Sequence, residues 1–410
     1  MIVQWYTVGM NVRTVVTVTL GGLLIGFWTA WAYGMYTEST APNLQEDLAL
    51  LSQVEQSFPS LDNFFADFSK EQGAVLAFQL LRAAALPPNI DLHLLGHTIG
   101  DELYRQEGLD GMALCTNDFR NACSHSVVIG ALLENGMSVF DTVNDVCKEA
   151  PGGSGAYTMC FHGFGHGVLA YTEYDFEAAI DLCERTGTAA YNYRESAECI
   201  GGMVMEMNDG IHDPEVWQEQ YALFVDTENP LSICQVSYMP EHAKERCYSY
   251  VTPYLFDAAA GGDSGLPTPD IFADAFAYCA AEPNEVHRRE CYAGFGKEFI
   301  VLVNDYDIQN IETISNERLE RLIGWCALAG NQVGNEECLL EVVNSLYWGG
   351  ENDYLVSIRY CTLLPDDVTD ACFVALFDNV ANYRRDPVYQ RQFCTDVPEA
   401  FTEQCTAYLL

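Results

Sequence analysis

Five of the eight histidines in this 410-residue chain lie between positions 93 and 166, in a pattern that could bind a metal ion. His93 and His97 are four residues apart, and so are His162 and His166. Residues four apart share one face of a helix, with Cβ atoms about 5–6 Å apart, so two imidazoles can bind one ion. His125 and His162 each stand two residues after a cysteine, which predicts equivalent positions on neighbouring helices. These five histidines predict a transition-metal site.

Three further side chains could complete the metal shell. Asp101 lies one turn beyond His97, Glu206 follows in the next histidine-free unit, and Met205 has the register of His166. Imidazole with carboxylate or thioether suits copper, zinc or iron, although a methionine on a helix more often fills the core. The chain has no C-x-x-C-H motif for covalent haem, which leaves haem b with two imidazole ligands open. Metal handling and metal-dependent catalysis, with Asp101 or Glu206 as the base, are both compatible with this pattern.

A second copy of the histidine motif shows that imidazole is not needed for folding. Cys160-Phe-His-Gly-Phe-Gly-His166 has the same frame as Cys291-Tyr-Ala-Gly-Phe-Gly-Lys297, where both histidines are replaced. The alternative interpretation is structural: the histidines are satisfied polar groups inherited by related repeats. His212, His242 and His287 are solitary, and we expect them at the surface.

Sixteen cysteines fall into eight close pairs, 8 to 16 residues apart, and no cysteine is left over. Such a local spacing, recurring along the chain, is typical of a helical repeat array. We expect each pair to form a disulfide that joins the two helices of one hairpin, and the hairpins to stack into an all-α solenoid. The expected disulfides are Cys115–Cys123, Cys147–Cys160, Cys183–Cys199, Cys234–Cys247, Cys279–Cys291, Cys326–Cys338, Cys361–Cys372 and Cys394–Cys405.

Two resemblances follow from these motifs. In architecture, residues 115–405 resemble the Sel1-like cysteine-rich repeat proteins. In motif, the chain is similar to a family of extracytoplasmic proteins of unknown function that carries H-x-x-x-H-x-I-G, C-x-H-G and C-x-H-G-x-G-H segments. The matching segments begin at His93, Cys123 and Cys160, and Ser126 replaces the glycine of the second. The resemblance implies helical hairpins outside the cytoplasm and no particular chemistry.

The N-terminus predicts a membrane anchor. Residues 14–36 contain no charge and exceed the ~20 residues that a spanning helix requires. Disulfides need an oxidising compartment, so we expect residues 1–13 in the cytoplasm and the rest outside, in the periplasm or at the cell surface. A cleaved signal peptide is the alternative. After the anchor we expect a tether at 37–47, N-terminal helices at 48–88 with a turn at Pro59-Ser60, and the repeat domain at 89–410.

Charge restricts the partners. The chain carries 59 acidic and 19 basic residues, a net charge of −40. Such a charge repels phosphate backbones and excludes nucleic-acid binding. If the histidines are structural, the alternative function is a scaffold for a protein partner or an accessory subunit of a membrane complex. The Gly22-x-x-x-Gly26 motif of the predicted anchor would then pack against another membrane helix.

Overall fold

The computed structural model describes residues 44–87, 90–210, 212, 214–224, 226–261, 267–305, 311–349 and 353–410. Across these residues the chain is helical and contains no β-strand, which confirms the all-α prediction. The chain forms two compact units, Met1–Leu51 and Ser52–Leu410. Of the first unit only helix α2 (Leu44–Leu51) is described, and it begins inside the predicted tether. The predicted anchor, residues 14–36, lies outside the described residues.

The second unit begins with two helices that support the first histidine helix. α3 (Phe58–Gln72) and α4 (Ala74–Ala83) pack against α5 (Leu92–Glu107). The predicted turn at Pro59-Ser60 is wrong, because α3 begins at Phe58 and carries Pro59 in its first turn. Proline is tolerated there, since the first backbone N–H groups of a helix have no partner inside the helix.

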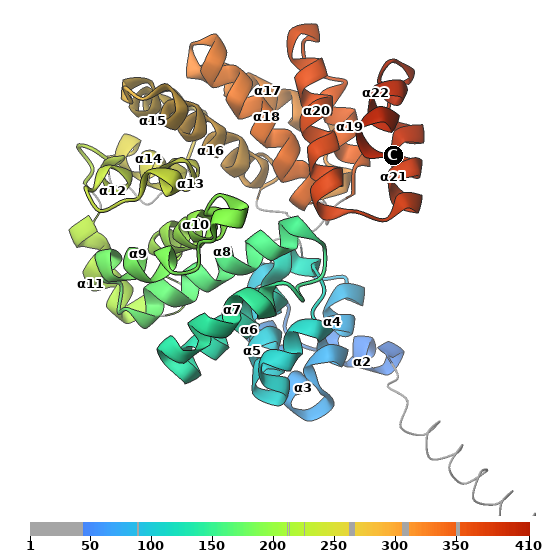
Figure 1. Cartoon of the computed structure of the whole chain (residues 1–410). Helices are drawn as coiled ribbons and strands as arrows, with labels where there is room; N and C mark the ends of the chain where they lie inside the picture. The colour runs from blue at the N-terminus through green and yellow to red at the C-terminus, as the bar shows by residue number, and fades with distance from the viewer. Residues whose placement is uncertain are drawn as a thin grey trace, which may run out of the picture. The chain divides into compact units, whose positions relative to one another are not determined.

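The remainder of the unit is a succession of helical hairpins (Figure 1). In each hairpin a shorter first element is followed by a longer second helix, with some further helices between hairpins. The first elements are η1 (Gly108–Leu114), α7 (Phe140–Cys147), α9 (Phe176–Glu184), α12 (Ser232–Gln235), α15 (Pro269–Ala281), α17 (Asn316–Cys326), α19 (Leu355–Cys361) and α21 (Pro387–Asp396). The second helices are α6 (Asp118–Asn135), α8 (Ser154–Tyr171), α10 (Arg194–Asp209), α13 (Glu241–Tyr250), α16 (Glu285–Val303), α18 (Gln332–Gly349), α20 (Asp366–Tyr383) and α22 (Glu399–Leu409). The connecting elements are η2 (Gly136–Val139), η3 (Ala189–Tyr191), α11 (Pro214–Phe224), α14 (Thr252–Ala259), η4 (Ile311–Thr313) and η5 (Ala327–Ala329).

All eight predicted disulfides are present. Each joins the first element of a hairpin, or the residue after it, to the second helix, with Cα atoms 5.5 to 5.6 Å apart. No cysteine is free. Closing a loop of this size stabilises the fold by about 3 kcal/mol per bridge in the chain-entropy model. The bridges therefore hold each second helix in a defined position relative to its own first element.

α5 contacts α6, and the second helices then contact one another in chain order from α6 through α8, α10, α13, α16 and α18 to α20. α20 then returns to α8. At this contact Arg385 donates to the hydroxyl of Ser154 at 2.8 Å, and the ring of Tyr383 lies against Gly155. Segments more than 200 residues apart in sequence thus meet, and the inner faces of the second helices surround a common space.

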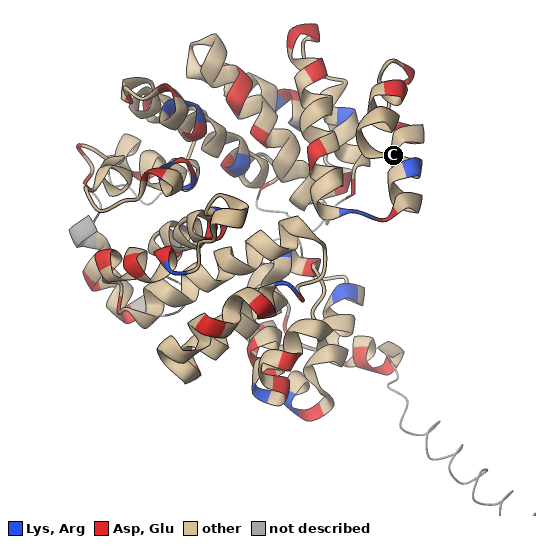
Figure 2. Cartoon of the chain, in the orientation of Figure 1, with Lys and Arg blue, Asp and Glu red and all other residues tan. Residues whose placement is uncertain are grey.

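Acidic side chains occur on helices throughout the described chain, whereas basic ones are few (Figure 2). One described stretch, Asp118–Cys147, is apolar and long enough by composition to cross a membrane. Half of its most apolar window is buried inside the protein, however, and it contains α6, a disulfide and His125. These features are those of a core helix.

Candidate metal centre

Helices α5, α6 and α8 bring the five predicted histidines into one cluster. The ring centroids of His93 and His97 are 4.6 Å apart, and those of His162 and His166 are 5.1 Å apart. His125 lies between the two pairs, 5.7 Å from His93 and 6.0 Å from His162. The pairs that share a helix face and the histidine that follows Cys123 therefore meet at one place in the fold.

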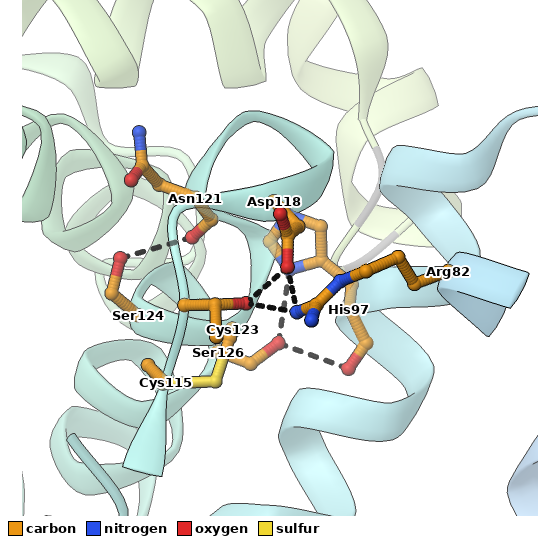
Figure 3. Close-up of a disulfide and its surroundings, with 9 residues drawn as sticks. Arg82, His97, Cys115, Asp118, Asn121, Cys123, Ser124 and Ser126 are labelled. Carbon is orange, nitrogen blue, oxygen red and sulfur yellow. Dashed lines mark hydrogen bonds and ion pairs between the residues drawn. A yellow bond between two sulfur atoms is a disulfide. The ribbon is translucent and has the colours of Figure 1, made fainter. Parts of the chain in front are cut away.

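His93 and His97 point the same kind of nitrogen at each other. Their Nε2 atoms are 3.1 Å apart. Nδ1 of His93 donates to the carbonyl oxygen of Phe119 at 2.7 Å. Ser126 gives its hydroxyl proton to the carbonyl oxygen of His97, so its Oγ accepts from Nδ1 of His97 at 3.0 Å (Figure 3). With both protons on Nδ1, two Nε2 lone pairs face one another.

A strained segment positions the acceptor for His93. Phe119, Arg120 and Asn121, at the start of α6, have φ values of 54°, 54° and 62°, in the left-handed region that non-glycine residues rarely adopt. The Cys115–Cys123 disulfide and the Arg82–Asp118 ion pair hold the segment on either side (Figure 3). Such strain persists where surrounding structure enforces it, and it concentrates at functional sites.

Two further histidines have ring nitrogens with no partner. His125 is 2% exposed, and no described atom meets hydrogen-bond geometry with Nδ1 or Nε2, although the backbone of Met159 lies close enough to attract a proton. His162 is 3% exposed; its Nε2 lies 3.3 Å from Nε2 of His166, and its Nδ1 has no partner. A buried polar atom without a partner costs free energy, so these nitrogens are available to bind a metal ion or a water molecule.

Glu206 orients two imidazoles. Its side chain is fully buried, and Oε2 accepts from Nδ1 of His166 at 3.0 Å and from Nδ1 of His212 at 2.8 Å. Oε1 accepts from the hydroxyl of Tyr174 at 2.8 Å and from the backbone N–H of His212 at 3.0 Å. Four hydrogen bonds occupy the carboxylate, and in their neutral forms both histidines carry a free lone pair on Nε2.

His212 was expected at the surface, and this prediction is wrong. Its ring lies 5.9 Å from that of His97 and 6.0 Å from that of His166. Gly210, with φ +59°, ends α10 in a left-handed turn, which brings the chain back to Glu206. Periodicity does not detect such a residue, because it follows the helix rather than lying on it.

The other two histidines that were expected at the surface, His242 and His287, differ from each other in burial. His287 is buried and stacks on Tyr248 at 4.9 Å, so its predicted surface position is also wrong. His242 is partly exposed and lies 2.9 Å from Glu184. Neither residue belongs to the cluster.

Burial keeps the clustered imidazoles neutral. It lowers the pKa of His93 to about 4, against a weaker opposing effect of the Phe119 carbonyl. Burial and the neighbouring histidines hold the pKa values of His97, His125 and His162 well below the ordinary value, and burial also lowers that of His166. For Glu206, hydrogen bonds from His166 and His212 outweigh burial and lower the pKa of the carboxyl. For His212, in contrast, the hydrogen bond and charge of Glu206 outweigh burial and raise the pKa. The five predicted histidines are thus held as neutral imidazoles, the form that binds metals, next to one carboxylate and one more basic histidine.

The additional predicted ligands occupy different positions. Glu206 contacts His166 and His212 as described. Met205 lines the same cavity as the histidines, whereas its neighbours Met203 and Met207 are core residues. Asp101 has an exposed side chain near His212, and its charge adds to the larger effect of Glu206, which raises the pKa of that histidine.

The glycines of the motif allow the helices to approach one another. A Cβ at Gly163 would lie 2.4 Å from the ring of His125. A Cβ at Gly165 would lie 1.9 Å from the carbonyl oxygen of Cys199, and one at Gly202 1.9 Å from that of His162. Only glycine permits the crossing of α8 and α10 that places His166 against Glu206.

Beside the cluster is a cavity of about 440 Å³. The residue six positions after the second cysteine of a hairpin lines it in five hairpins. These residues are His166, Met205, Lys297, Asn344 and Asp378. The shared register shows that each of these hairpins directs the same helix face toward the cavity. At this position of the repeat, α8 carries a histidine, and the other hairpins carry other residues.

Compared with known proteins, the chain matches no family model, no curated protein and no solved structure. The family resemblance drawn from the histidine motifs therefore stays a prediction. The functional argument rests on the geometry of the cluster.

Proposed function

We propose that this chain is an extracytoplasmic helical-repeat protein that binds transition-metal ions through its histidine cluster. One observation carries the proposal: Nε2 of His93 and Nε2 of His97 face each other at 3.1 Å, while both Nδ1 atoms have hydrogen-bond acceptors. Two lone pairs at this distance repel unless a cation lies between them. Two nitrogens bound to one tetrahedral zinc ion at about 2.0–2.1 Å would be about 3.3 Å apart.

The cluster divides into two groups of three imidazoles. His93, His97 and His125 offer nitrogens that all lie within 4.8 Å of one another. His162 and His166 have facing Nε2 atoms at 3.3 Å, and Glu206 holds His212 beside them. We assign one ion to each group, with Glu206 as the carboxylate that orients ligand imidazoles rather than as a ligand.

The kind of ligand atom in the cluster restricts which metals can bind. Imidazole nitrogen suits zinc, copper and iron, and no free thiolate is present to compete. A haem with two axial imidazoles would need its ligands on opposite faces of the ring, and the facing pairs at 3.1 and 3.3 Å leave no space for a macrocycle between them. The proposal therefore concerns metal ions, for metal handling or metal-dependent chemistry.

Disulfides support a location outside the cytoplasm, because they persist in oxidising compartments. We retain residues 14–36 as the proposed anchor and the stacking of hairpins into a solenoid as the proposed architecture. The scaffold alternative does not account for the unpartnered nitrogens of His125 and His162.

The test is metal analysis of the full-length protein purified without added metal and then loaded with zinc, copper or iron. Two double variants, His93→Gln/His97→Gln and His162→Gln/His166→Gln, are compared with His242→Gln, which changes a histidine outside the cluster. We expect about two ions per wild-type chain, about one in each double variant and two in the control. Intact disulfides in every variant would show that folding is preserved. Equal, negligible metal in wild type and variants would disprove the proposal.

A further inference from the structure

The cavity beside the cluster has the properties of a binding site for a second molecule. Its volume of about 440 Å³ falls within the ~300–1,000 Å³ range of small-molecule sites. His93, His125, His162 and His166 line it. His125 and His162 thus border a space large enough for more than a metal ion.

The cavity brings together several of the few basic side chains of an acidic protein. Arg120, Arg194, Arg246 and Lys297 line it, which is four of the 19 basic residues of the chain. Four acidic side chains, Glu198, Glu298, Glu341 and Asp378, line it as well. An anion is favoured where the cations exceed the ionised carboxylates next to them.

Internal ion pairs account for part of this charge. Glu198 lies 3.1 Å from Arg246 and 3.9 Å from Arg194, and one carboxylate cannot neutralise two guanidinium groups. Burial raises the pKa of Glu341 and outweighs the opposing hydrogen bond that Asn344 donates to it at 2.8 Å, so this carboxyl is less charged than an exposed glutamate. The two arginines therefore retain excess positive charge.

Two other cations flank the histidines. Arg120, in the strained segment, forms no ion pair with any described residue, and its charge acts on His93. Lys297 acts on His162 and His166. Its ammonium lies 3.0 Å from Glu298 and 4.2 Å from the ring centroid of Tyr250, and the Tyr250 ring lies 5.0 Å from that of His162, tilted by 37°. One cation thus lies beside each histidine group.

Aromatic rings form another part of the lining. Tyr250, Trp348 and Tyr383 contribute to it, and the centroids of Trp348 and Tyr383 are 6.0 Å apart. Flat apolar surfaces beside a cationic end match a molecule with an anionic head and a planar body. The carboxylates of Glu198 and Glu298 disfavour a small anion of high charge, such as phosphate.

We infer that the cavity binds a small organic carboxylate, with its anionic group between Arg120 and Lys297 at the histidine cluster and its planar body against Tyr250, Trp348 and Tyr383. This site does not depend on the proposed metal, because both cations belong to the protein. The molecule would lie next to the ions where they are bound, as a substrate or a further ligand.

Calorimetric titration of the full-length protein with benzoate tests the inference, in metal-stripped and zinc-loaded forms. Benzamide, a neutral analogue of the same shape, and inorganic phosphate are the comparison probes. We expect benzoate to bind, and benzamide and phosphate to bind at least about tenfold more weakly. Arg120→Gln and Lys297→Gln should each weaken benzoate about tenfold. Lys297→Arg should restore it.

The matched control is Lys148→Gln, which removes an exposed lysine that pairs with Asp145; it should leave benzoate binding unchanged. Equal affinity for benzoate and benzamide, stronger binding of phosphate, or no effect of either cavity variant would overturn the inference, as would the absence of benzoate binding. Benzoate binding to a protein that takes up no metal would support this site and disprove only the metal proposal. Metal uptake without benzoate binding would do the reverse.

Discussion

Replacing Glu206 with glutamine should remove one metal ion without unfolding the protein. The carboxylate accepts four hydrogen bonds, and one of them comes from the backbone N–H of His212, which cannot become an acceptor. The amide oxygen of Gln must therefore stay on that side. Its NH₂ then faces Nδ1 of His166 and of His212, and each imidazole must move its proton to Nε2 to accept.

The size of the effect follows from these contacts. Both histidines would present N–H groups to the cluster instead of lone pairs, so the affinity of the second ion should fall at least 10- to 100-fold, about 1.4–2.7 kcal/mol. Two charge-assisted hydrogen bonds become neutral ones, which should lower the free energy of unfolding of the metal-free protein by about 2 kcal/mol. The ion of His93, His97 and His125 should remain.

Glu195 supplies a matched control. It is another fully buried glutamate of α10, and it accepts from Tyr157 at 3.1 Å and from the hydroxyl of Thr188 at 2.6 Å, without contact to the histidines. Metal titration and urea unfolding of both variants separate the two roles. Glu195→Gln should lower stability and leave two ions, whereas Glu206→Gln should leave one. A Glu206→Gln protein that binds two ions with unchanged affinity would refute the orienting role.

Two further predictions concern packing and pH. Gly202→Ala should destabilise the fold by about 3 kcal/mol or more, because its Cβ meets the carbonyl oxygen of His162; Gly324→Ala, in a helix with open space, should stabilise it by about 0.5–1 kcal/mol. Urea unfolding measures both, and equal effects would contradict the close helix crossing. Burial raises the pKa of Glu290 to about 7, so the stability that its protonated form contributes below pH 4.5 is lost as pH rises through 7. Glu290→Gln should therefore gain up to about 3 kcal/mol over wild type between pH 5 and pH 8, and parallel stability curves would contradict this.

The cysteine spacing predicted most of the fold because it is a local signal. A pair of cysteines 8 to 16 residues apart can bridge only one hairpin, so the spacing predicted both the disulfide partners and the helical hairpins. The turn at Pro59 failed because proline suits the first turn of a helix as well as a break between helices. Helix register likewise predicted which histidines share a face, and the cluster of His93, His97 and His125 has that arrangement.

Other features of the site depend on contacts that no local pattern contains. His212 follows a left-handed turn, and only folding brings it to Glu206. In the aligned motif Lys297 takes the place of a histidine, and the sequence comparison indicated only that folding does not need imidazole there. In the structure Lys297 lines the same cavity as His166. The return of α20 to α8 joins Ser154 to Asn382, across 228 residues.

The amino-acid sequence alone determined the helices, their disulfide partners and the faces that carry imidazole, because these depend on residues a few turns apart. The tertiary structure alone decided that the histidine faces meet, that a buried glutamate accepts hydrogen bonds from two of the histidines, and that four basic side chains line the adjoining cavity. Those outcomes depend on the orientation in which the hairpins pack against one another. Close contacts at glycines and buried charges between helices that are distant in sequence determine that orientation.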